Sequence, residues 1–242
     1  MKKEQLGKYL LLTFLFTYLC WGSLAIFVKL GLLGFSHPIA VSLHLIGGFG
    51  PTIATLFVFR GKLSIKSLID FVFGHKKKSV RYLLLFCVFE IVVLGISSME
   101  VNPVMSLYLA PIVFIQAVFL YGGNEEWGWR GIMQPILEGK MPFPVATLIT
   151  GSVWAVWHIP LWFVDGASQQ NIPFPLFAIL GILLSFWLAT IYKRTHCVFY
   201  CSIFHGLTNT LLSLFVIKVN AILFIYRLCY YAVIKCSFMV FI

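Results

Sequence analysis

Long apolar runs, separated by short polar or basic intervals, dominate the pattern of this 242-residue chain. A membrane-spanning helix needs about 20 mostly apolar residues. Eight stretches qualify as predicted spans: 9–33, 38–59, 82–99, 104–138, 144–164, 173–192, 195–217 and 219–240. The pattern therefore predicts an all-α fold, a polytopic transmembrane helical bundle of about eight helices.

Three intervals depart from this simple pattern. Residues 104–138 are too many for one upright helix, so we expect a tilt, or a bend at Gly122-Gly123, where two glycines weaken the helix. Residues 60–81 mix apolar and basic positions and are predicted to lie on the membrane surface. The segment 219–240 carries two basic residues, and a surface-lying helix is its alternative prediction.

Composition places the chain outside the soluble classes. Hydrophobic residues make up 60% and charged residues 11%, against about 45–50% and about 25% in soluble domains. The net charge is +10, and the basic residues gather in alternate short loops. By the positive-inside rule, this alternation predicts a multi-pass cell-membrane protein with both termini in the cytoplasm. The charge then serves orientation and contact with the lipid bilayer, and we expect no nucleic-acid partner.

Charged residues inside the apolar sequence are the candidate chemistry. Glu125, Glu126 and Arg130 lie in the fourth predicted span, and the two glutamates are a quarter of the chain's eight acidic residues. A charge at the bilayer centre costs about 3 kcal/mol on insertion scales, so such residues are usually functional. Later spans carry His158, and then His205 with Asn209.

The distances of these groups from the predicted turns suggest a common depth. Glu125 lies 13 residues before Glu138, His158 lies 14 residues after Pro144, and His205 lies 11 residues after Arg194. At about 1.5 Å per residue, each lies roughly 17–21 Å along its helix. Antiparallel neighbours can therefore bring them to one level.

Each of these residue types has a use in hydrolysis. A carboxylate can take a proton from water and later give it to a leaving amine, and His205 and the Asn209 amide can stabilise an oxyanion. Glu126 and Arg130 can pair at i, i+4. Glu125, His158 and His205 also match a zinc site with an open water position, and a metal-free mechanism is the alternative.

Structural explanations compete with each of these roles. Intramembrane histidine and asparagine often form hydrogen bonds between helices. Cys197 and Cys201 precede His205 at helical spacing and can be read as metal ligands, although cysteine is also a common packing residue. Glu90 is a further intramembrane acid with no evident partner in the sequence.

The three motifs together resemble the CPBP family, which contains type II CAAX prenyl proteases and bacteriocin-processing enzymes and is also called Abi. The family's Glu-Glu-x-x-x-Arg is matched by Glu125, Glu126 and Arg130, and its His-x-x-x-Asn by His205 and Asn209. Its aromatic-x-x-x-His is matched from residue 154 to His158, with Trp where Phe is usual. The resemblance covers roughly 104–217.

The resemblance implies an intramembrane endopeptidase, usually labelled a metalloprotease. In it Glu125 activates water with the help of His158, the oxyanion is bound by His205 and Asn209, and the site is oriented by Glu126 and Arg130. Three regions follow: N-terminal transmembrane helices with a basic cytoplasmic loop (1–103), the CAAX-protease-like catalytic core (104–217) and a C-terminal hydrophobic segment (218–242). The expected partner is a peptide or protein substrate with a membrane-associated segment, in prenyl-protein or bacteriocin processing or self-immunity.

Two other functions fit the same residues. An ion- or proton-coupled transporter would use the buried charges as a path, and it predicts discontinuous helices and repeated halves. The sequence shows no internal repeat. A non-catalytic membrane immunity scaffold would not need the complete motif set.

Overall fold

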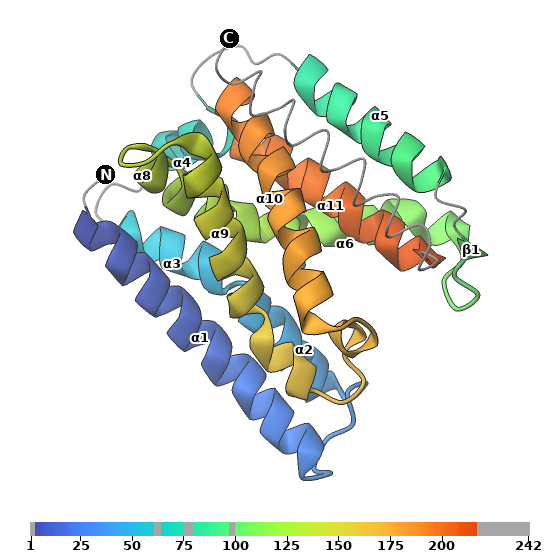
Figure 1. Cartoon of the computed structure of the whole chain (residues 1–242). Helices are drawn as coiled ribbons and strands as arrows, with labels where there is room; N and C mark the ends of the chain where they lie inside the picture. The colour runs from blue at the N-terminus through green and yellow to red at the C-terminus, as the bar shows by residue number, and fades with distance from the viewer. Residues whose placement is uncertain (1–2, 61–63, 75–79, 97–99, 217–242) are drawn as a thin grey trace.

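Helices form nearly all of the regular structure in the computed structural model, which describes residues 3–60, 64–74, 80–96 and 100–216 (Figure 1). The predicted span 219–240 lies outside these residues. Within them, the β-structure is one antiparallel pair of two-residue strands, β1 (Glu100–Val101) and β2 (Phe215–Val216). The predicted all-α helical bundle is confirmed.

The α-helices are α1 (Lys3–Lys29), α2 (Pro38–Gly48), α3 (Gly50–Val58), α4 (Ile65–Phe73), α5 (Arg81–Ile96), α6 (Ala110–Phe119), α7 (Glu126–Gly128), α8 (Gln134–Glu138), α9 (Phe143–Trp157), α10 (Phe174–Thr195) and α11 (Val198–Leu214). Short 3-10 helices are η1 (Leu107–Leu109), η2 (Gly123–Glu125), η4 (Ile159–Phe163) and η5 (Ser168–Asn171), and η3 (Trp129–Met133) is a π-helix.

Among the described residues, some of the predicted spans are not helices long enough to cross a membrane by themselves. In the part of the chain that the structure describes, four helical segments qualify: Glu4–Lys29, Leu107–Glu138, Phe143–Phe163 and Phe174–Thr195. The bent pair α2–α3 makes five. The described part of the predicted span 82–99 is the 16-residue helix α5, and residues 97–99 lie outside the described residues. The predicted span 195–217 corresponds to the 17-residue helix α11, which gives way to β2 after Leu214.

The predicted span 38–59 is broken into α2 and α3, which meet at 45°. Pro51 lies in the first turn of α3, where its missing N–H is tolerated. Small residues bring the break close to α1: a Cβ at Gly47 would overlap the Trp21 indole, and one at Gly50 would overlap Thr17. Thr17 Oγ1 donates a hydrogen bond of 2.7 Å to Gly47 O, which fixes the bend against α1.

The segment Leu107–Glu138 is interrupted at the glycine pair, as the sequence predicted. Gly122 has φ +112°, a conformation that favours glycine, and it separates α6 from η2. Beyond the break the segment continues through α7, the π-helical η3 and α8. Short π-helical stretches are frequent at functional sites, and this one begins three residues after Glu126.

The interrupted segment crosses the middle of the bundle (Figure 1). Helix α11 packs along α6 and η2, and α3 packs against α7. An ion pair between Lys193 Nζ and Glu138 Oε2, 2.7 Å apart, lies at one end of the bundle. At the other end, Lys29 Nζ lies 3.9 Å from Asp165 Oδ1. The orientation of the termini relative to the membrane stays a prediction.

Candidate active site

Glu126 lies at the centre of a buried charged cluster. Its Oε1 accepts a hydrogen bond of 2.8 Å from His205 Nδ1, and its Oε2 lies 3.3 Å from Arg130 Nε. Glu126 and Arg130 are 0% and 1% exposed, so neither charged side chain reaches the protein surface. The predicted i, i+4 pair is therefore present, and the histidine of the later motif completes it.

Arg130 extends this cluster to the neighbouring helices. Its Nη2 donates to Ser185 Oγ at 2.9 Å and to Ser185 O at 3.2 Å, on α10. Ser185 Oγ in turn donates to Thr147 O of α9 at 3.4 Å. The arginine thus ties the π-helical segment to two other helices, which makes it a structural centre as well as a counter-ion.

Glu125 faces a different partner from its neighbour. Its Oε2 accepts a hydrogen bond of 2.7 Å from Trp154 Nε1, the indole N–H of the aromatic motif position. A phenylalanine at this position has no such donor. Space for the larger ring comes from α10, where a Cβ at Gly181 would overlap the Trp154 ring.

The Trp154 ring also contacts both motif histidines. Its centroid lies 4.4 Å from the His158 ring and 5.9 Å from the His205 ring, and it stacks on Phe177 at 15°. The carboxylate of Glu125 and the two imidazoles therefore surround a single indole. From the sequence, Trp154 was a departure from the motif. Its indole N–H, which phenylalanine lacks, was the feature that could have predicted a hydrogen bond to a site carboxylate.

His158 is held by its own helix. Its Nδ1 lies 2.9 Å from Trp154 O, and because a carbonyl only accepts, Nδ1 carries the proton. In the neutral ring, Nε2 is then left with a free lone pair. The ring is packed by aromatic side chains of Trp21, Trp157 and Phe177.

Asn209 lies one turn beyond His205 and joins α11 to the helix break. Its Nδ2 donates to Tyr121 O at 3.1 Å. A Cβ at Gly122 would overlap the Asn209 amide and press on the His205 ring. The glycine break therefore lets the interrupted segment approach both polar residues of the last motif closely.

The structure brings all six predicted site residues into one neighbourhood, although not all into direct contact. Among the described residues, Glu125 has no hydrogen bond to either histidine. It is bonded instead to Trp154, whose ring contacts both histidine rings. Ser185 was not foreseen. The sequence suggested no partner for Glu90. In the structure Glu90 accepts a hydrogen bond of 2.6 Å from Thr208 Oγ1, so it lies at the contact between α5 and α11, beside this last motif.

The expected zinc ligands are not arranged around a common point. In the described residues, no group of three or more His, Cys, Asp or Glu is arranged to hold a metal ion. His158 Nδ1 is occupied by a carbonyl and His205 Nδ1 by Glu126, while Cys201 Sγ faces Leu188 O. A bound zinc ion therefore stays a prediction.

Comparison with known proteins points to one family. Residues 106–211 match the family "Type II CAAX prenyl endopeptidase Rce1-like". The chain is 31% identical over 108 residues to "CAAX prenyl protease 2" of Methanococcus maripaludis. That match covers 41% of this chain and 38% of the relative, so the chain spans well under half of the relative's length. The matched segment contains every predicted site residue, whereas the boundaries 104–217 stay a prediction.

Proposed function

We propose that this chain, whose residues 106–211 match the Rce1-like family of type II CAAX prenyl endopeptidases, is an intramembrane endopeptidase that uses Glu125 as its general base. One observation carries the proposal: two adjacent buried carboxylates have different partners. Glu126 is hydrogen-bonded to His205 at Oε1 and forms an ion pair with Arg130 at Oε2, whereas Glu125 accepts a hydrogen bond from Trp154 at Oε2. A pair of like groups in unlike environments is the usual arrangement when one reacts and the other supports.

The reaction follows from these positions. Glu125 takes a proton from a water molecule, and the resulting hydroxide attacks the peptide carbonyl carbon. His158 orients that water through the lone pair of Nε2, since its Nδ1 proton is committed to Trp154 O. The same Glu125 proton then passes to the leaving amine as the C–N bond breaks.

The oxyanion formed in this reaction is stabilised from α11. Glu126 fixes the His205 ring by accepting a hydrogen bond from its Nδ1. When Nε2 is also protonated, its N–H can donate a hydrogen bond to the oxyanion. The Asn209 amide, held at Tyr121 O, supplies the other donor after a small movement of its side chain. We assign Trp154 a positioning role, because its N–H fixes the carboxylate that must meet the water.

The substrate is proposed as a peptide with a membrane-associated segment. The relative is named a CAAX prenyl protease, which makes a prenylated C-terminal peptide the first candidate. Unmodified apolar peptides, such as a bacteriocin precursor, are the second. The matched pair to assay is one peptide with and without its prenyl group.

The test of the proposal is peptide cleavage by purified protein in detergent. Wild type and Glu125→Ala are compared on internally quenched peptides, with product masses identifying the cut bond. Cleavage by wild type alone supports the proposal, and equal cleavage by both proteins removes it. Elemental analysis of the active protein, together with chelator treatment, decides separately between the zinc and the metal-free form.

A second candidate, an ion- or proton-coupled transporter, is favoured by the discontinuous helices α2–α3 and Leu107–Glu138. Against it, Arg130 and His205 are both paired with Glu126, and the sequence has no repeated halves. Proton flux into liposomes distinguishes the two functions. Flux that disappears in Glu125→Gln, without any peptide cleavage by wild type, would favour the transporter.

A further inference from the structure

The candidate active site is almost closed, and one aromatic ring lies where it reaches the surface. Glu125 and His158 are each 6% exposed, so a substrate reaches them through a small opening. Among the described residues, four aromatic rings pack against His158, and of these only Phe177 of α10 is partly exposed. The three buried rings belong to Trp21, Trp154 and Trp157. The exposed edge of Phe177 therefore marks the opening of the site.

Phe177 contacts the side chains that hold both halves of the proposed reaction. Its ring stacks on Trp154 with centroids 5.4 Å apart, and its centroid lies 5.2 Å from that of His158. Trp154 holds the Glu125 carboxylate, and His158 orients the water. An extended peptide advances about 3.3 Å per residue, so the side chains next to the scissile bond lie within about one ring's width of the reacting carbon. Phe177 is in position to meet one of them.

Two further rings continue from Phe177 toward the surface. The centroid of Trp162 lies 4.9 Å from that of Phe177 and 5.1 Å from that of Phe174, and both added rings are partly buried. Trp162 is fixed in place, because its Nε1 donates to Ile172 O at 3.0 Å and its backbone oxygen accepts from Gln170 Nε2 at 3.1 Å. Phe174, Trp162 and Phe177 thus form a preformed aromatic wall at the opening.

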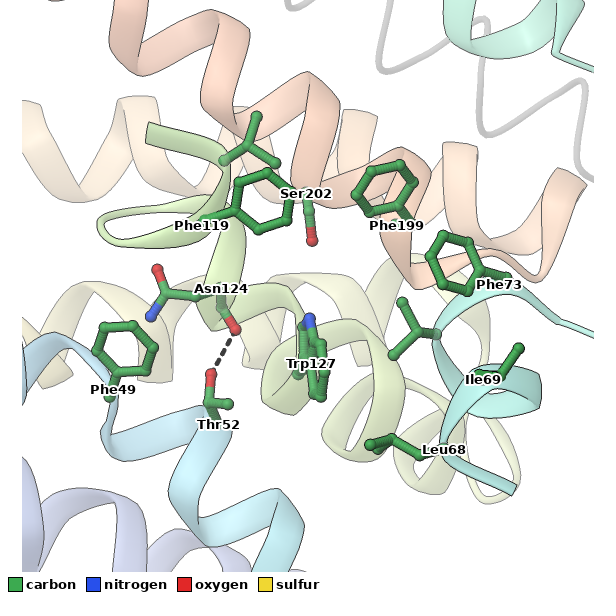
Figure 2. Close-up of a pocket in the computed structure, with 12 residues that line it drawn as sticks. Phe49, Thr52, Leu68, Ile69, Phe73, Phe119, Asn124, Trp127, Phe199 and Ser202 are labelled. Atoms are coloured by element: carbon green, nitrogen blue, oxygen red, sulfur yellow. Dashed lines mark hydrogen bonds between the residues drawn. The ribbon is translucent and has the colours of Figure 1, made fainter. Parts of the chain in front are cut away.

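The apolar pocket shown in Figure 2 is a separate space. It has a volume of about 310 Å³ and lies between α3, α4, α6 and α11, with Phe119 and Phe199 among its lining residues. Its lining, within the described residues, includes neither the two glutamates nor the motif histidines nor the aromatic wall. A side chain next to the reacting bond therefore meets the wall, and the pocket offers a control position.

We infer that Phe177 determines substrate specificity: with Trp162, it binds an apolar side chain next to the scissile bond. Aromatic rings bury a large apolar area, and no charged group faces these rings in the printed contacts of the wall, so a charged substrate side chain would lose its water without gaining a partner. The inference rests on the proposed function, because it assigns the residue that selects the peptide cleaved at Glu125.

The first experiment measures selectivity once product masses have identified the cut bond. Peptides with leucine or alanine on either side of that bond are cleaved by wild type, Phe177→Ala and Phe199→Ala. Phe199 is the matched control, since it is also a partly buried phenylalanine and its ring contacts are Phe73 and Phe119. The ratio of kcat/KM values for the two peptides does not change with the folded fraction or with a general loss of turnover.

Wild type and Phe199→Ala should prefer a leucine peptide by about ten-fold or more, and Phe177→Ala should lose most of this preference. An unchanged ratio in Phe177→Ala, or an equal loss in Phe199→Ala, overturns the inference.

The second experiment detects the contact without any need for turnover. A benzophenone amino acid takes the place of Phe177 or, as the control, of Phe199, and the protein is irradiated in detergent with the leucine peptide. We expect the peptide to be cross-linked from position 177, in competition with unlabelled peptide. Cross-linking from position 177 without cleavage by wild type would support the binding site and remove the protease. Cleavage by wild type with cross-linking from position 199 alone would overturn the inference and leave the protease standing.

Discussion

Helix α1 and the segment Leu107–Glu138 are both long and apolar enough to cross a membrane, yet they are built in opposite ways. Helix α1 is one unbroken α-helix of 27 residues, with exposed side chains such as Leu11 and Leu19 facing outward. The segment Leu107–Glu138 has 32 residues and passes through 3-10, α and π geometry. The regular helix carries packing, and the irregular one carries the charged cluster.

This difference teaches where irregular backbone is tolerated in a membrane. Non-helical backbone at membrane depth requires other partners for its polar groups. The interrupted segment has such partners. Ser202 Oγ donates a hydrogen bond of 2.6 Å to Gly123 O, and Thr52 Oγ1 donates one of 2.6 Å to Asn124 O. Neighbouring helices thus stabilise the very turns that direct Glu125 and Glu126 to different partners.

The largest expected effect is a loss of peptide cleavage, caused by a substitution that leaves the interrupted segment folded. Glu125→Gln keeps the shape and an acceptor for Trp154, but it cannot take a proton from water. Peptide cleavage should fall by about 10²–10⁴-fold, with an unchanged thermal unfolding midpoint. Glu90→Gln is the control, because Glu90 is also a buried acid but is bonded to Thr208. Near-normal turnover of Glu125→Gln would move the base to another residue.

Arg130→Leu tests whether the charged cluster holds the interrupted segment together. It leaves Glu126 buried with a lost counter-ion, and breaking such a pair costs about 3–5 kcal/mol of unfolding free energy. Lys193→Leu is the matched control, since its pair with Glu138 is 36% and 18% exposed and should contribute about 1 kcal/mol or less. The two unfolding midpoints in detergent are compared, and equal midpoints would contradict the structural role of Arg130.

Trp154→Phe separates a donor that acts on the site from one that only joins helices. It removes the N–H bound to Glu125, and a hydrogen bond to a charged group contributes about 1.5–3 kcal/mol, so kcat should fall roughly 10–100-fold. Trp157→Phe on the same helix removes the donor to Thr17 Oγ1 instead. That variant should lose stability while its folded fraction keeps kcat. A similar fall in kcat for both would mean that Trp154 acts only through packing.

The smallest effect compares one substitution in the two helices. A Cβ at Gly22 in α1 meets nothing within 4 Å, whereas one at Gly128 would overlap Tyr9 and press on Pro51. Gly22→Ala should stabilise by about 0.5–1 kcal/mol, and Gly128→Ala should destabilise by about 1–3 kcal/mol. Unfolding midpoints measure both changes. Stability changes of opposite sign would support the difference between α1 and the interrupted segment, and changes of the same sign would contradict it.

Local sequence rules predicted much of the site. The i, i+4 spacing of Glu126 and Arg130 predicted their pairing, and the glycine pair predicted the break at Gly122. The break between α2 and α3 and the early end of α11 were missed. Both depend on contacts distant in sequence: Gly47 against Trp21 of α1, and β2 against β1. Hydropathy records how much apolar sequence there is and carries no information about such contacts.

The same limit explains why the partners of the two glutamates could not be predicted. Neighbouring residues on a helix point about 100° apart, so Glu125 and Glu126 had to face different surroundings. Which carboxylate meets Trp154 and which meets His205 depends on how α9 and α11 pack around the segment. Ser185 as the partner of Arg130 depends on α10 in the same way.

The contact between Trp154 and Gly181 has a consequence for how this site can vary among relatives. The glycine on α10 makes room for an indole, and the smaller ring of a phenylalanine leaves that room empty. Gly181→Ala should therefore be harmful beside Trp154 and harmless beside Phe at position 154, a coupling that a double-mutant cycle measures. Positions 154 and 181 should accordingly co-vary, so that a chain with the usual Phe at this motif position is free to have a side chain at the position of Gly181.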